Sequence, residues 1–151
     1  IIHSLFTDLA AMPIQPSSDV SAAGTVEIFA EFASGLKDLD GFSHIYLIYH
    51  LHKARFSGLT VTPFLDSEPR GLFATRAPNR PNIIGLSLVK LVRIEGSILN
   101  VENLDVLDGT PLLDIKPYVP EFEGVAGVRI GWLEQAREKI SKKKSDDRFT
   151  K

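Results

Sequence analysis

Hydrophobic and polar residues alternate over short stretches of the chain, and twenty Pro and Gly residues separate these stretches. Apolar and acidic side chains alternate over residues 26–32, which is typical of a half-buried strand. Residues 31–42 mix Leu and Phe with charged side chains and predict a short helical turn. Residues 42–52 (FSHIYLIYHLH) are apolar on both faces and rich in aromatic and β-branched side chains, so they predict a central strand.

Short segments between turn residues predict the remaining elements. Strands are expected at 59–64, 71–75 and 112–115, and another is expected to begin at 128–132. Residues 84–95 and 97–102 flank Gly96 and predict a β-hairpin, and residues 134–144 predict a C-terminal helix. Strands at this spacing favour a barrel or a sandwich over alternating β and α units.

Length and composition fit one ordinary globular domain. At 151 residues the chain can bury roughly two-thirds of its unfolded surface, and its 44% apolar and 24% charged residues are near globular averages. No apolar run approaches the roughly 20 residues that cross a bilayer, and the first residues show no signal peptide, so no membrane partner is expected. The absence of cysteine excludes disulfides and thiolate metal sites and fits a cytoplasmic protein.

The net charge of −2 argues against binding nucleic acid by bulk electrostatics, but the charge is unevenly distributed. Residues 134–151 hold seven Lys and Arg against four acids, whereas residues 1–133 hold ten against fifteen. The basic stretch is expected either to contact phosphates or to form a solvated helix end with a frayed terminus. We therefore divide the chain into a main domain, residues 1–133, and a basic C-terminal helix and tail, residues 134–151.

Residues 70–85 (RGLFATRAPNRPNIIG) form the first of two segments with candidate chemistry. Two Pro and two Asn residues predict a stiff, irregular loop that carries Arg76 and Arg80. A guanidinium presents five donors in a rigid fork that suits a carboxylate or a phosphate. The residue types alone leave two alternatives open, ligand binding and pairing with neighbouring acids. Because the chain has no Gly-rich dinucleotide fingerprint and no P-loop, a nucleotide site here would have to be built in another way.

Residues 104–120 (LDVLDGTPLLDIKPYVP) form the second segment. Asp105, Asp108 and Asp114 lie among apolar residues, so we expect hydrogen bonds or a partner charge to hold them. These carboxylates are candidates for holding a ribose diol or balancing a cationic ligand, and a buried pair with Arg76 is one hypothesis. The alternative for Asp108 is purely structural, because Asp-Gly-Thr-Pro predicts a turn with its acid at the first position.

His44, His50 and His52 share one face of the expected central strand. His50 and His52 are candidate zinc ligands, with His3 or an acid as the third. We favour hydrogen-bonded histidines near a ligand or in the core, and expect no metal. Upstream, the Pro-bracketed residues 12–16 predict an extended stretch that serves either as a connector or as a lid across a site.

An ordered series of short motifs extends this picture. The motifs are Phe42-Ser43-His44-Ile45, Gly71-Leu72-Phe73-Ala74-Thr75-Arg76, Arg80-Pro81-Asn82, Ile84-Gly85, Leu107-Asp108-Gly109-Thr110-Pro111 and Asp114-Ile115-Lys116-Pro117-Tyr118. Together they resemble the TsaA-like family, whose best-known members are TrmO-type tRNA methyltransferases, from about Ile2 to Pro120. A match to one motif would be weak, but a match to all of them in order is specific.

This resemblance implies a mainly β protein, a single TsaA-like β-barrel domain with short helices and a C-terminal helical extension. It implies an enzyme that uses S-adenosyl-L-methionine, is usually a homodimer, and methylates N6 of threonylcarbamoyladenosine at position 37, in the anticodon loop of tRNA. By motif, the family's cofactor contacts fall here on Pro13, Ile14, Gln15, His52, Lys53, Arg76, Leu86, Asp105, Val106, Leu107 and Asp108.

The chain departs from the family pattern at two places. Many relatives have Pro-Arg-Gln where this chain has Pro-Ile-Gln at 13–15, so one expected cation is missing from the cofactor or substrate contact. Relatives commonly have Asn-Pro-Ile-Gly where this chain has Asn-Ile-Ile-Gly at 82–85. The second change frees one φ angle of the loop and is expected to be tolerated.

Methyl transfer from a sulfonium is an in-line displacement that depends largely on positioning. The reactive nitrogen belongs to a ureido group, so a general base would help, and Asp108 and Asp114 are the candidates. We assign Arg76 to the methionine carboxylate, and Arg80, Lys116 and the basic tail to tRNA phosphates.

Three alternatives stay open. The first keeps the cofactor and changes the substrate, and the second is a non-catalytic sensor that binds S-adenosylmethionine and signals through a dimer. The third is a sugar- or oligonucleotide-binding barrel without the cofactor.

Overall fold

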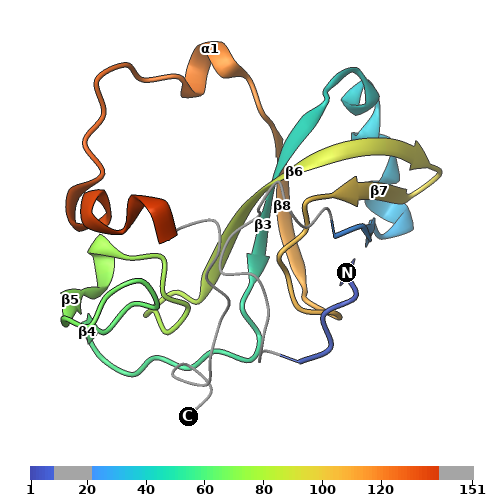
Figure 1. The fold of residues 1–151 in the computed structure, drawn as a ribbon. Helices are drawn as coiled ribbons and strands as arrows, with labels where there is room; N and C mark the ends of the chain where they lie inside the picture. The colour runs from blue at the N-terminus through green and yellow to red at the C-terminus, as the bar shows by residue number, and fades with distance from the viewer. Residues whose placement is uncertain (9–21, 140–151) are drawn as a thin grey trace.

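The structure is a computed structural model that describes residues 1–8 and 22–139 (Figure 1). These residues form a six-stranded sheet in the order β1-β2-β7-β6-β3-β8 and a two-stranded sheet of β4 and β5, and every strand pair is antiparallel. The larger sheet contains β1 (Ile2–His3), β2 (Gly24–Glu27), β3 (His44–His50), β6 (Ile84–Glu95), β7 (Ile98–Glu102) and β8 (Leu112–Pro117). The smaller sheet contains β4 (Thr60–Val61) and β5 (Arg70–Gly71).

The helical elements are short. The structure has 3-10 helices η1 (Ala30–Leu36), η2 (Leu39–Gly41), η3 (Leu72–Ala74) and η4 (Gly131–Lys139), and one α-helical turn, α1 (Pro120–Glu123). A mainly β, antiparallel fold with few short helices is therefore confirmed. Within the described ranges, no helix combines the length and the apolar character that a membrane span requires.

One face of β3 builds the centre of the core. Ile45, Leu47 and Tyr49 are buried and alternate with half-exposed residues on the other face. Buried Val89 on β6 and Leu99 on β7 belong to the same cluster, and burying each such side chain contributes roughly 1.5–3 kcal/mol. Since β3 pairs with β6 on one side and β8 on the other, the prediction of an interior strand is confirmed. However, only one of its faces is buried.

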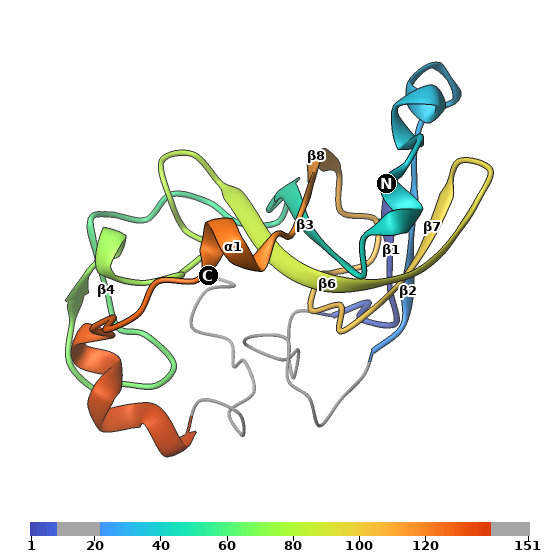
Figure 2. The same cartoon turned by 90° about the horizontal axis from the view of Figure 1, so that it is seen from above.

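The hairpin of β6 and β7 follows the prediction closely. The strands are joined at Gly96, whose φ of 63° lies in the left-handed region that glycine adopts at no steric cost. A register shift between Leu91 and Arg93 marks an irregularity in β6. This strand is long and curved, and it crosses the middle of the molecule (Figures 1 and 2).

The two edges of the larger sheet approach each other at one point. Ile2 on β1 forms an isolated bridge with Thr110, two residues before β8. The Ile2 N–H donates to the Thr110 carbonyl at 2.9 Å, and the Gly109 N–H donates to the Ile2 carbonyl at 3.0 Å. In the described residues the sheet is thus curled, and its edges are joined by a single bridge rather than by a ladder.

A second part of the molecule, the lobe of residues 51–83, contains β4, β5 and η3 and lies to one side of the larger sheet (Figure 1). The C-terminal segment leaves β8, passes through α1 and brings η4 against this lobe. Trp132 Nε1 donates to the Ala74 carbonyl at 2.8 Å, and the Arg70 guanidinium lies 5.9 Å from the Trp132 ring. The chain therefore returns to the lobe after completing the sheet.

Several expected boundaries are wrong for local reasons. The expected strand at 71–75 keeps only Gly71, because the backbone and the hydroxyl of Thr75 both bond the Leu72 carbonyl and close a 3-10 turn. The strand expected over 26–32 ends at Glu27. No strand forms at 128–132, where η4 begins at Gly131, and this helix is of the 3-10 type and starts before the expected 134.

The helical turn expected at 31–42 is confirmed as η1 and η2, and the strand expected at 112–115 is confirmed as β8, which continues to Pro117. The strand expected at 59–64 forms only over Thr60–Val61, as β4.

Candidate functional site

Three polar side chains form a connected chain on the inner face of the sheet. The Tyr49 hydroxyl lies 2.9 Å from Ser87 Oγ, and Ser87 Oγ donates to Asp105 Oδ1 at 2.5 Å. Tyr49 on β3 and Ser87 on β6 are buried, and Asp105 follows β7 in the connection to β8. The structure therefore joins a site residue expected from the sequence to two residues that sequence reasoning did not assign.

Gly85 explains how the tyrosine reaches the serine. It lies opposite Tyr49 in the register of β3 and β6, and a Cβ at this position would overlap the Tyr49 ring. Without that atom the ring lies against the β6 backbone, and its hydroxyl meets Ser87, two residues further along the same face. A Gly-x-Ser pattern in a strand opposite an inward-facing Tyr is the sequence signal that could have indicated this network.

Asp105 has an unusual environment for a carboxylate. Burial raises the pKa of its carboxyl to about 6, while the Ser87 hydrogen bond, its own backbone N–H and the Arg76 charge act in the opposite direction. Burial and the neighbouring Asp105 also raise the pKa of Tyr49, so this phenol stays neutral and can donate. A half-buried carboxyl that titrates near neutral pH is a candidate for ligand binding or catalysis.

Arg76 acts on this network through its charge but does not touch it. Its guanidinium lowers the pKa values of Asp105, Tyr49 and Tyr46, yet the ion pairs of the described residues do not include Arg76, and the residue is exposed. The hypothesis of a buried pair between Arg76 and an aspartate is therefore wrong. Its exposed guanidinium and the half-buried Asp105 present opposite charges without an ion pair between them.

Asp108 anchors the N-terminal strand. The Ser4 N–H donates to Asp108 Oδ1 at 3.0 Å, and His3 Nδ1 lies 3.6 Å from the same oxygen. The expected turn is present, because Gly109 adopts a left-handed φ of 74° and the Thr110 hydroxyl donates to the Leu107 carbonyl. Structural contacts thus occupy one carboxylate oxygen, and the Asp108 side chain remains 41% exposed.

Asp114 and Lys116 form a pair with each other on β8. Lys116 Nζ lies 2.9 Å from Asp114 Oδ2, and this interaction holds the pKa of the Asp114 carboxyl below its usual range. Asp114 lies opposite Ile48 in the register of β3 and β8. Since neighbouring side chains of a strand point to opposite faces, Asp114 lies on the other face of the sheet from Tyr49. The structure does not bring Asp114 and Asp105 to one face.

His52 follows β3 and lies close to the turn after β7. Its Nδ1 is 3.4 Å from Thr110 Oγ1, and burial together with the charge of exposed Lys53 lowers the pKa of His52. These effects favour the neutral imidazole. His50 lies on the half-exposed face of β3. In the part of the chain that the structure describes, no group of three or more His, Asp or Glu side chains is arranged to hold a metal ion.

Arg80 is engaged inside its own loop. Nη1 donates to the carbonyls of Leu72, Thr75 and Ala77 at 3.4, 2.9 and 3.3 Å. The guanidinium also lies 5.6 Å from the ring centre of Phe73, which is 74% exposed. These contacts organise residues 72–80 and leave the guanidinium half-exposed.

The remaining expected contacts divide between the two faces of the sheet. Leu86 is 51% exposed and lies opposite Ile48, so its side chain points away from the face that carries Ser87. Val106 is buried and Leu107 is half-buried in the loop that carries Asp105. Pro13, Ile14 and Gln15 lie outside the described residues, as does the tail beyond residue 139.

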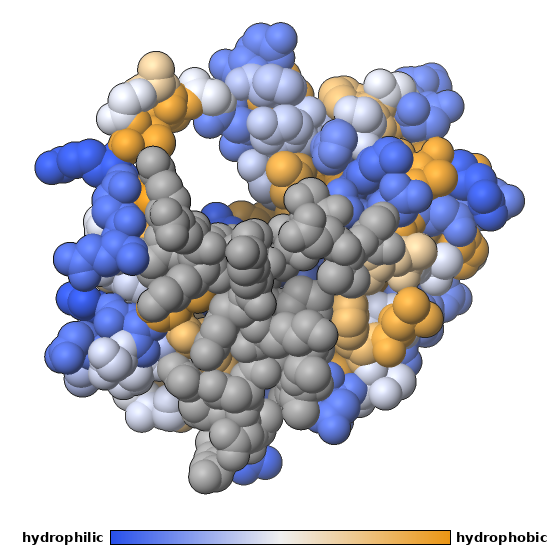
Figure 3. Space-filling model, viewed as in Figure 1, coloured by the Kyte–Doolittle hydropathy of each residue, from blue (hydrophilic) through white to orange (hydrophobic). Residues whose placement is uncertain are grey.

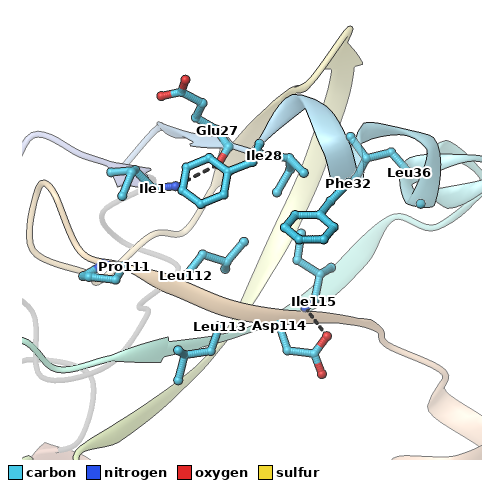
Figure 4. A pocket seen from close by; sticks show the side chains of 12 residues that line it. Ile1, Glu27, Ile28, Phe32, Leu36, Pro111, Leu112, Leu113, Asp114 and Ile115 are labelled. Atoms are coloured by element: carbon cyan, nitrogen blue, oxygen red, sulfur yellow. Dashed lines mark hydrogen bonds between the residues drawn. The ribbon is translucent and has the colours of Figure 1, made fainter.

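A groove of about 510 Å³ lies along the first four residues of β8 (Figure 4). Leu112 and Ile115 point into it toward Ile28 and Phe32, while Leu113 and Asp114 point to the opposite side of the strand. Its lining is mostly apolar, and among the residues expected to form the site it includes only Asp114.

Comparison with known proteins agrees with the motif series. A family model described as the tRNA-methyltransferase O N-terminal domain matches residues 1–124. A probable S-adenosyl-L-methionine-binding protein of Pyrococcus abyssi is 56% identical over 149 residues, 99% of this chain and 81% of the relative. The tRNA (adenine(37)-N6)-methyltransferase of Escherichia coli is 35% identical over 146 residues, 90% of this chain and 62% of that enzyme.

The crystal structure of TrmO from Pseudomonas aeruginosa is similar with a TM-score of 0.73 and 41% sequence identity, over 87% of this chain. The chain spans 58% of that protein, so it corresponds to little more than half of some relatives and to most of others. A match of the family model over 124 of the 151 residues, together with these relatives, shows that the chain belongs to the family of the tRNA-methyltransferase O N-terminal domain.

Proposed function

We propose that this protein is an S-adenosyl-L-methionine-dependent methyltransferase that acts on N6 of threonylcarbamoyladenosine at position 37 of tRNA. The observation that carries the proposal is the match of residues 1–124 to the family model of the tRNA-methyltransferase O N-terminal domain. At the site, exposed Arg76 and half-buried Asp105 present opposite charges without an ion pair between them. Family membership supplies the activity, because relatives from mouse and Escherichia coli are named tRNA (adenine(37)-N6)-methyltransferases.

The residues of the site suit the chemistry of the cofactor. S-adenosylmethionine carries a carboxylate, two cationic groups and a ribose diol, and when bound it supplies a methyl group on a positively charged sulfur. An exposed guanidinium suits the carboxylate, and a half-buried aspartate suits a cation or a pair of hydroxyls. Arg76 and Asp105 would therefore hold opposite ends of the ligand, with His52, Lys53 and residues 106–108 beside them.

The reaction requires the protein mainly to position its substrates and to accept one proton. Of the two candidate bases, Asp108 suits the role better than Asp114, because the ion pair with Lys116 lowers the pKa of Asp114 and makes it the weaker base. Asp108 keeps an exposed side chain close to the loop that carries Asp105.

The lobe of residues 51–83 is a suitable surface for RNA. It holds five Lys and Arg against two acids in a chain whose net charge is −2. Exposed Phe56 and Phe73 offer faces for unpaired bases, and the half-exposed Arg80 lies over Phe73. Recognition of single-stranded RNA loops commonly combines stacking on aromatic rings with phosphate contacts, so we assign the anticodon loop to this lobe. Lys116 is a further candidate for phosphate contact once its pair with Asp114 opens.

The proposal also includes a closed barrel and a homodimer. The bridge between Ile2 and Thr110 supports closure of the curled sheet into a barrel. The segment between β8 and η4 exposes Phe122, Val125 and Val128, at 81%, 70% and 61%, and this apolar surface supports a homodimer, which analytical ultracentrifugation would test.

We keep the division into a domain of residues 1–133 and a basic extension of residues 134–151, because the family model ends at residue 124. A tRNA substrate is consistent with a cytoplasmic protein.

One assay tests the proposal directly. Methyl transfer from labelled cofactor is measured on tRNA with and without the threonylcarbamoyl group, and the product nucleoside is located by mass spectrometry. We expect N6-methylated threonylcarbamoyladenosine from the first tRNA and no product from the second. Equal activity on both tRNAs would contradict the proposed substrate.

A second candidate function is binding of S-adenosylmethionine without transfer to tRNA. It is favoured by the Pyrococcus abyssi relative, whose name states binding alone and whose length this chain spans to 81%. Tight cofactor binding in calorimetry, combined with no methylated nucleoside in the assay above, would support this candidate over the enzyme.

A further inference from the structure

While Asp105 is ionised, the hydrogen bonds between Tyr49, Ser87 and Asp105 run in one direction. A serine hydroxyl has a single proton, and Ser87 donates it to Asp105 Oδ1 at 2.5 Å. Ser87 therefore accepts from Tyr49, whose hydroxyl lies 2.9 Å away. The donors line up toward the carboxylate, so each bond strengthens the next.

This network is a built feature of the fold. Tyr49 and Ser87 are 6% and 3% exposed, so both side chains are buried on the inner face of the sheet. Gly85 lies opposite Tyr49, and any side chain there would displace the ring that carries the donating hydroxyl. Three positions on two strands thus serve one carboxylate in a loop.

We infer that Ser87, supported by Tyr49, is a positioning residue that orients the Asp105 carboxylate and keeps it as an acceptor for the bound cofactor. This inference rests on the proposed function, since it takes Asp105 to be a cofactor contact. Ser87 holds one carboxylate oxygen, Oδ1, through its hydrogen bond. A carboxylate offers about four acceptor sites, so Asp105 retains capacity for a ligand.

The charges around Asp105 determine how the network of Tyr49, Ser87 and Asp105 responds to pH. Burial raises the pKa of Asp105 to about 6, and the Ser87 hydrogen bond and the Arg76 charge oppose that rise. Among the residues that the structure describes, the titratable groups that interact with Asp105 are Tyr49 on β3, which stays neutral, and Arg76 on the loop after η3. Loss of the Ser87 hydroxyl therefore raises the pKa of Asp105 further, and the aspartate becomes protonated near neutral pH.

The test compares Ser87→Ala with the wild type in two measurements. The first follows the side-chain carboxyl carbon of Asp105 by NMR between pH 4 and 9 in the cofactor-free protein, and we expect the midpoint to rise by about one pH unit. The second measures the affinity for S-adenosylmethionine by calorimetry. We expect a loss of about threefold at pH 6.5 that largely recovers at pH 8.5, where Asp105 is ionised again.

Three further variants separate positioning from packing. Ser87→Thr keeps the hydroxyl and should restore both measurements, and Tyr49→Phe should shift both in the same direction by less. Val89→Ala is the matched control, because Val89 is fully buried on the same face of β6 and has no polar contact with Asp105. Val89→Ala should lower the stability of the protein without moving the midpoint of the Asp105 titration.

Wild-type midpoint and affinity in Ser87→Ala would overturn the inference. A uniform loss of affinity at every pH, equal to that of Val89→Ala, would also overturn it, because it would reduce Ser87 to a packing residue. Failure of the wild type to bind S-adenosylmethionine at any pH would instead overturn the proposed function. The NMR midpoint would still decide whether Ser87 controls Asp105.

Discussion

Replacement of Arg80 by alanine tests whether its guanidinium stabilises the loop or binds RNA. In the structure Nη1 donates to three backbone carbonyls, and the contact with Thr75 at 2.9 Å is the shortest. One hydrogen bond from a charged donor is worth about 1.5–3 kcal/mol. The exposed contact with Phe73 adds about 0.5–1 kcal/mol. The two longer bonds share the same nitrogen and add little.

We therefore expect Arg80→Ala to lower the free energy of unfolding by about 2–4 kcal/mol. For a chain of this length that loss corresponds to a fall in the melting temperature of about 4–16 °C. Urea and thermal unfolding followed by circular dichroism measure both quantities. Arg76→Ala is the matched control in the same loop, because Arg76 is exposed and outside the ion pairs of the described residues. It should change stability by less than about 0.5 kcal/mol.

The reasoning fails if Arg80→Ala unfolds like the wild type while its affinity for tRNA falls. That result would show that the guanidinium serves the RNA and that the loop carbonyls are satisfied by water in its absence. A fall in stability with unchanged affinity for tRNA would instead show a purely structural arginine. A fall in both would show that the residue binds RNA through the loop that it organises.

Three other changes have defined outcomes. Because burial raises the pKa of Asp105 to about 6, the folded state binds this proton more tightly than the unfolded chain, so the contribution of Asp105 to stability falls as the pH rises from about 4 to about 6. Measured by urea unfolding, the stability of Asp105→Asn relative to the wild type should be about 2–3 kcal/mol higher at pH 7.5 than at pH 4. An equal difference at both pH values would refute the burial argument. Gly85→Ala should lower the free energy of unfolding by about 1–3 kcal/mol in the same assay, because the added Cβ overlaps the Tyr49 ring. Gly35→Ala is the control, because the space around Gly35 is open and the stability of the protein should not change. Equal effects of the two changes would contradict the overlap. Arg55→Glu, at an exposed position of the lobe of residues 51–83, should raise the KM for tRNA and flatten its dependence on salt without changing the affinity for S-adenosylmethionine by more than about threefold. A salt dependence equal to that of the wild type would remove Arg55 from the RNA surface.

The strands that could be predicted are those whose signals are local. The β6–β7 hairpin follows from a glycine between two apolar runs, and β3 follows from its aromatic and β-branched residues. The expected strand at 71–75 fails because the Thr75 hydroxyl bonds back to the Leu72 carbonyl, a competition between side chain and backbone that the hydrophobic pattern does not report. The strand expected over 26–32 fails for a related reason, since Phe32 bonds the Phe29 carbonyl and starts η1.

The site could be predicted only in part because its members are paired across strands. Arg76 and Asp105 stand out in the sequence as charges among apolar or stiff surroundings, and the structure couples them electrostatically. Ser87 carries no charge that would single it out, and the Gly-x-Ser pattern to which it belongs gains meaning only from the register that places Tyr49 opposite Gly85. Asp114 matches the same kind of pattern as Asp105, yet its strand position turns it to the other face.

The arrangement of the sheet explains why residues distant in sequence contribute to one place. β3 and β6 lie side by side over seven register pairs, and the loop after β7 returns across the end of this pair, which brings Asp105 to Ser87. The bridge from Ile2 to Thr110 and the bond from Ser4 to Asp108 fix the same loop from the N-terminal side. Asp108 thus holds the loop in place while Asp105, three residues earlier, faces the polar network. The two acids of one short motif therefore have different surroundings. A change at Asp108 is expected to shift the loop that carries Asp105 as well as to remove the proposed base.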